Sequence, residues 1–112
     1  MDFALSEEQT AIFDMAYGFG QDHIAPFARK WEKDETIPKE LWPKIAELGF
    51  GGLYVSEDAG GSGLSRLDAT LVFEALSMAC PSVAAFLSIH NMCAKMLDSF
   101  ASNDLKARIM GD

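Results

Sequence analysis

Six of the nine glycines of this chain fall between positions 49 and 63, where the sequence reads GFGGLYVSEDAGGSG. A glycine-rich loop can bind phosphate when it joins a strand to a helix and directs its backbone amides at the anion. Here the loop lies between two expected helices, matches neither a dinucleotide-binding nor a P-loop spacing, and carries Glu57 and Asp58. The sequence therefore favours a compact surface loop, whose glycines permit positive φ angles and close approach of backbones, over a phosphate site.

The other side chains that could carry acid–base, nucleophilic or metal chemistry are scattered. His90 lies among apolar neighbours, which is typical of a hydrogen-bonded core histidine. Glu74 is the one carboxylate within an apolar stretch; it could be a tuned base, but a surface or interface salt bridge is the favoured interpretation. Cys80 and Cys93 have no metal-ligand spacing, and two buried, reduced thiols are favoured over a disulfide. The sequence predicts no catalytic constellation and no metal site in this chain.

Length and composition limit the classes of protein. The chain has 112 residues, 49% of them hydrophobic, and a net charge of −8, which suits one domain with a real core. Such a charge argues against a nucleic-acid partner and against an anionic membrane surface. The segment from Met1 to Gln9 is short, polar and acidic, and resembles neither a signal peptide nor a transit peptide. We therefore expect a cytoplasmic protein if it is bacterial, or a mature mitochondrial-matrix form if it is eukaryotic.

Periodicity and capping signals predict an all-α fold, a bundle of five to six helices with the glycine-rich loop between the third and the fourth. The first three helices are expected to begin near Ser6, Pro26 and Pro38, with Gly49 as the cap that ends the third. The second helix is expected to bury Phe27 and Trp31.

Three further helices are expected after the glycine-rich loop. Ser65 and Asp68 would cap a helix that runs to about Cys80. A long helix follows over 82–100, and Ser102 would cap a short last helix that ends near Met110.

The long helix over 82–100 is apolar around most of its circumference. Only four of its residues form a polar stripe: Ser88, Asn91, Lys95 and Asp98. A helix of this kind needs cover on several sides, so we expect it at the centre of the bundle. Its charged and polar residues exclude a transmembrane span.

Several separated blocks, in order, give the chain a family resemblance. They are LSEEQ at 5–9, AELGFGGLYVSEDAGGSGLS at 46–65, and then RLD, FEAL, SIHNMCA and DSF. The chain resembles the N-terminal helical domain of acyl-CoA dehydrogenases over nearly its whole length. Its local wording is most similar to family members that act on short, branched acyl chains, with isobutyryl-CoA in valine breakdown as the implied substrate.

The resemblance implies a three-domain flavoenzyme, of which residues 1–112 are the first domain. A middle β domain and a C-terminal helical domain, both absent from this chain, would hold FAD between them. In such enzymes a glutamate removes the α-proton of the acyl-CoA, the β-hydride goes to the flavin, and electrons pass to electron-transfer flavoprotein. A homo-oligomer is also implied. The base and most FAD contacts would lie beyond Asp112, so we expect the chain alone to be inactive and to bind no cofactor.

By position in the family's long helix, four residues are candidates for the wall of the acyl pocket: Ala85, Phe86, Ile89 and Cys93. They share one apolar side of the helix at i, i+3 and i+4 spacing, and an acyl pocket wall is apolar. The bulk of Phe86 and Ile89 would shorten the pocket. The competing interpretation is that these residues are ordinary core contacts. Two other functions stay open from the sequence: a non-catalytic helical interaction module and a bundle that binds an acyl chain.

Overall fold

Residues 3–110 are described by a computed structural model, and every regular element within that range is helical. The all-α prediction with five to six helices is therefore confirmed. The chain end at Asp112, on which the expectation of missing domains depends, lies outside the described residues. The α-helices are α1 (Glu7–His23), α2 (Ala28–Asp34), α3 (Leu41–Glu47), α4 (Arg66–Ser77), α5 (Pro81–Phe100) and α6 (Asn103–Ile109).

Serine caps begin three of the helices, as the sequence predicts. Ser6 and Gln9 form a reciprocal capping box at the start of α1. Ser65 and Asp68 do the same at the start of α4, and the Ser102 hydroxyl accepts from the Leu105 amide at the start of α6. These side chains satisfy amides that have no partner within the helix.

The proline signals place the boundaries less well than the serine caps. Pro26 lies in a 3-10 turn over Ala25–Phe27 that leads into α2. Pro38 lies three residues before α3 rather than at its start, while Pro43 falls in the first turn of α3, where a missing amide costs little. Pro81 opens α5 as well as ending the segment before it. Gly49, with φ of 82°, follows the end of α3 as the expected left-handed cap.

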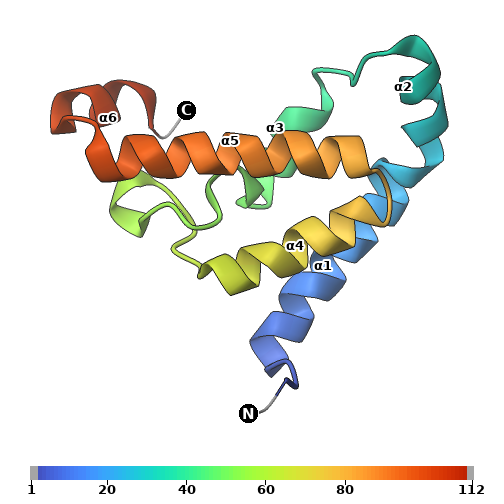
Figure 1. Ribbon diagram of the computed structural model, residues 1–112, viewed down its shortest axis with the longest axis horizontal. Helices are drawn as coiled ribbons and strands as arrows, with labels where there is room; N and C mark the ends of the chain where they lie inside the picture. The colour runs from blue at the N-terminus through green and yellow to red at the C-terminus, as the bar shows by residue number, and fades with distance from the viewer. Residues whose placement is uncertain (1–2, 111–112) are drawn as a thin grey trace.

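The helices spread out over the plane of Figure 1, with α5 across the top and α1 and α4 below it. The molecule measures 41 × 41 × 19 Å, a shape called a plate below. Helix α4 packs against both α1 and α5, and α3 reaches α5 through the glycine-rich loop that follows it. The expectation that α5 is a central helix covered on several sides is wrong, because Ile89, Met92 and Met96 on one of its sides are about half exposed.

The core lies where α1, α3, α4 and α5 meet. Its largest fully buried side chains include Phe50, Ile24, Ile45 and Leu76. Phe27, expected in the core, is 47% exposed and stacks on the half-buried Trp31. Between residues 3 and 110, no helix has both the length and the apolar character that a membrane crossing requires.

Candidate functional site

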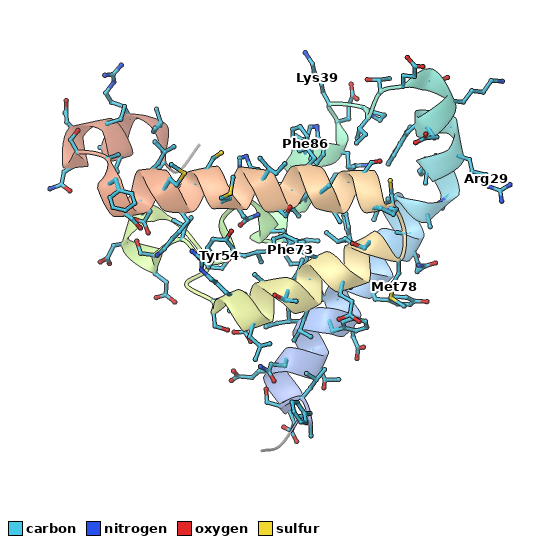
Figure 2. All side chains as sticks on the ribbon, in the orientation of Figure 1. Arg29, Lys39, Tyr54, Phe73, Met78 and Phe86 are labelled. Atoms are coloured by element: carbon cyan, nitrogen blue, oxygen red, sulfur yellow. The ribbon has the colours of Figure 1, made fainter. Side chains whose placement is uncertain are left out.

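Helix α5 has two apolar sides, and only one of them is buried. Val83, Ala84 and Leu87 face the core with at most 4% of their surface exposed. On the other side, four large side chains are about half exposed: Phe86 at 54%, Ile89 at 58%, Met92 at 51% and Met96 at 56%. Figure 2 shows this arrangement, with Phe73 of α4 on the side of α5 that faces α4 and Phe86 on the side that points away.

All four candidate wall residues, Ala85, Phe86, Ile89 and Cys93, are exposed along this outer side. The competing interpretation, that these four residues are ordinary contacts in the core of this chain, is therefore wrong. Phe86 is the one with a ring contact, a stack on Trp42 of α3 with ring centroids 4.3 Å apart. The four residues thus form a continuous apolar strip, defined here as the α5 wall.

Two residues of the polar stripe of α5, Asn91 and Asp98, bond to the glycine-rich loop. Asn91 is fully buried, and its side-chain oxygen accepts a 2.7 Å hydrogen bond from the Leu53 amide. Its side-chain nitrogen donates to the carbonyls of Phe50, at 2.9 Å, and of Leu87, at 3.0 Å. Each polar atom of this buried amide has a partner, so its burial does not carry the cost of an unsatisfied group.

Asp98 holds the same loop two turns further along α5. Its two carboxylate oxygens accept from the backbone amide and the hydroxyl of Ser56, each at 2.9 Å. Lys106 of α6 lies 3.2 Å from the carboxylate and donates to the Asp98 carbonyl. The bond from the Ser56 amide is the main cause that lowers the pKa of Asp98 below its ordinary value, and the Ser56 hydroxyl and Lys106 act in the same direction.

The glycine-rich loop folds back on itself and is compact, as predicted. The Ser62 amide donates to the Gly52 carbonyl and the Leu64 amide to the Leu53 carbonyl, both at 2.8 Å. Gly61 lies so close to the Val55 carbonyl that a Cβ there would be 2.2 Å from its oxygen. Because the amides of Gly61 to Leu64 all donate within the loop, they are not free to bind a phosphate.

The other residues that could carry chemistry are dispersed over the described residues, and two of them are placed differently from the prediction. His90 and Cys93 are exposed, so the predictions of a core histidine and of two buried thiols are wrong; Cys80 is buried, and both thiols are free. Glu74 is exposed. Within residues 3–110 no group of histidines, cysteines and carboxylates could hold a metal.

An open hollow of about 450 Å³ lies beside the start of α5, and Phe86 is the only wall residue that lines it. Ala85, Ile89 and Cys93 do not. The hollow therefore meets the α5 wall at Phe86 and does not extend along the rest of it.

Comparison with known proteins identifies the family. Residues 6–112 match the family model for the acyl-CoA dehydrogenase N-terminal domain. The chain belongs to the acyl-CoA dehydrogenase family. Mitochondrial isobutyryl-CoA dehydrogenase of Dictyostelium discoideum is 48% identical over 95% of this chain, and that of Bos taurus is 45% identical over 94%. The chain spans only 26% and 25% of the length of these two relatives.

Two solved structures have the same arrangement of helices as this chain. Butyryl-CoA dehydrogenase from Megasphaera elsdenii superimposes with a TM-score of 0.87 at 30% identity, over 98% of this chain and 30% of that one. A structure of PigA with FAD and proline gives 0.89 at 34% identity, with the same shares covered. The fold of this chain is thus that of an acyl-CoA dehydrogenase N-terminal domain, and flavin dependence is a property of the family.

Proposed function

We propose that this chain is the N-terminal part of an FAD-dependent dehydrogenase that forms the α,β double bond of a short, branched acyl-CoA, with isobutyryl-CoA as the substrate. The identity of 45–48% to two isobutyryl-CoA dehydrogenases supports the choice of substrate. Electron-transfer flavoprotein would be the electron acceptor and a homo-oligomer the assembled form. The compartment would be the mitochondrial matrix in a eukaryote and the cytoplasm in a bacterium.

The observation that carries the role of this chain is the exposure of the α5 wall. More than half of the surface of Phe86 and of Ile89 is exposed, although both side chains are large and apolar. An apolar strip of this kind suits the wall of a pre-formed acyl pocket. There, Phe86 and Ile89 would exclude water from the acyl chain and limit its length.

Several backbone donors of the chain are already in use, which supports flavin contacts outside it. The amides of Gly61 to Leu64 donate within the glycine-rich loop, and those of Leu53 and Ser56 donate to α5. Helices α1, α4 and α6 each have an amide of their first turn capped by a serine. These loop amides and these three helix starts therefore do not offer the set of free donors that a pyrophosphate needs. We assign the flavin contacts and the glutamate base to parts of the dehydrogenase outside this chain. Gel filtration of the purified chain with added FAD should separate the two, and stoichiometric retention of flavin would contradict this assignment.

Replacing Ile89 tests the wall directly. In the full-length dehydrogenase, Ile89→Gly should raise kcat/KM for a longer straight-chain acyl-CoA relative to isobutyryl-CoA by roughly tenfold, because a methylene in an apolar pocket is worth about 1–3 kcal/mol. Flavin content should not change. Met96→Gly on the same apolar side, but outside the wall, controls for the general cost of a glycine in a helix. If both variants keep the original chain-length preference, Ile89 does not line the pocket.

A further inference from the structure

The apolar residues of α5 do not explain its rotation about its own axis, that is, which of its sides faces the core. The side that faces the core buries Val83, Ala84 and Leu87, whereas Phe86, Ile89 and Met92 stay half exposed. Hydrophobic stabilisation grows with the apolar area removed from water, and the second set is larger. Burial alone would therefore favour a helix turned the other way, with its larger side chains inward.

Two polar residues oppose that rotation. Asn91 and Asp98 are seven residues apart, so at 3.6 residues per turn they lie within about 20° of each other on one side of α5. Asn91 bonds to Phe50 and Leu53, and Asp98 to Ser56. Turning α5 would leave a buried carbonyl and a buried amide of the loop without partners, and an unsatisfied buried group costs more than a made bond gains.

The same two residues fix where the α5 wall points. At 3.6 residues per turn, Ile89 and Cys93 lie about 160° around the helix from Asn91, Phe86 about 140° and Ala85 about 120°. Asn91 and Asp98 together are called the polar anchor here. The α5 wall thus lies on the side of the helix opposite to this anchor. We infer that Asn91 and Asp98 are positioning residues that set the rotation of α5 and thereby decide which apolar side chains line the acyl pocket. This inference rests on the proposed function of the α5 wall.

A change in substrate preference distinguishes positioning from mere stability. In the full-length dehydrogenase, Asn91→Leu and Asp98→Ala should each change the ratio of kcat/KM between isobutyryl-CoA and a longer straight-chain acyl-CoA by several-fold. Asp98→Asn keeps an oxygen that can accept from the Ser56 amide, so it should retain most of the original ratio. Leu76→Ala is the matched control, because Leu76 is fully buried on α4, beside Gly20 of α1. It should lower Tm and leave the ratio unchanged.

Each outcome decides the inference. Asn91→Leu and Asp98→Ala variants that melt earlier but keep the original ratio would overturn it. Should Asn91→Leu fail to fold, Asp98→Ala decides alone, since Asp98 lies at the partly buried end of the anchor. Ile89→Gly measured alongside separates the two proposals. If it shifts the preference while the anchor variants do not, only the positioning role fails; if Ile89→Gly has no effect, the wall assignment fails and the inference with it.

Discussion

The two sides of α5 are similar in hydrophobicity and opposite in environment. The inner side, with Val83 and Leu87, is buried at the centre of the plate, whereas the outer side exposes the larger Phe86 and Ile89. A buried amide, Asn91, lies on the inner side and bonds to the glycine-rich loop. This difference indicates that polar residues can determine which side of an apolar helix faces the core, and that they can do so more strongly than its apolar residues.

The largest expected effect is a difference in stability between two variants, each with one side chain shortened on one side of α5. Leu87→Ala should cost the chain about 3 kcal/mol of unfolding free energy, because it leaves a cavity in the core. Ile89→Ala, two residues away on the outer side, should change stability by no more than about 0.5 kcal/mol. Urea denaturation followed by circular dichroism measures both. Equal losses would mean that both sides of α5 are buried.

The loop that anchors the inner side should be the next most sensitive. Gly61→Ala would force a Cβ against the Val55 carbonyl, and we expect a loss of about 2 kcal/mol as the loop shifts. Gly18→Ala in α1 meets nothing within 4 Å and should stabilise the chain by about 0.8 kcal/mol through helix propensity. The same denaturation experiment compares them. A neutral Gly61→Ala would show that the loop tolerates displacement from α5.

The sequence could predict local structure well because local structure depends on nearby residues. Ser6, Ser65 and Gly49 act on amides and carbonyls a few positions away, so their motifs placed the ends of three helices correctly. The glycine-rich loop was likewise predicted as compact. These signals need no knowledge of what packs against them.

Burial could not be predicted in the same way because it depends on distant segments. Phe27 and His90 are exposed although their neighbours in the sequence are apolar. The polar stripe of α5 was visible in the sequence, but its loop partners, Leu53 and Ser56, lie about 40 positions earlier. One signal could have revealed the anchor: an amide and a carboxylate spaced two turns apart on an otherwise apolar helix.

The outer side of α5 should make the isolated chain self-associate. Its half-exposed side chains form an apolar area that a second copy could cover. We expect sedimentation equilibrium to show dimers at high concentration, and the double change Ile89→Lys with Met96→Lys to give monomers. Thr70→Lys with Ser77→Lys adds the same charge at the same seven-residue spacing on exposed positions of α4 and should not. A parent chain that stays monomeric at every concentration would contradict this.

The smallest effect concerns the acid stability of the anchor. The folded pKa of Asp98 lies below its ordinary 3.8, chiefly because its carboxylate accepts from the Ser56 amide. A depressed folded pKa stabilises the fold at pH values above the unfolded pKa, and this contribution is lost as pH falls through the folded pKa. Asp98→Asn should therefore be less stable than the parent chain near pH 6, and the gap should narrow below about pH 3.8 as the parent carboxylate becomes protonated. Urea midpoints measured from pH 6 to pH 2.5 would show it, with Asp104→Asn, an exposed residue of α6, as the control. If the gap between Asp98→Asn and the parent stays constant over this range, the charge of the Asp98 carboxylate does not contribute to the stability of the fold.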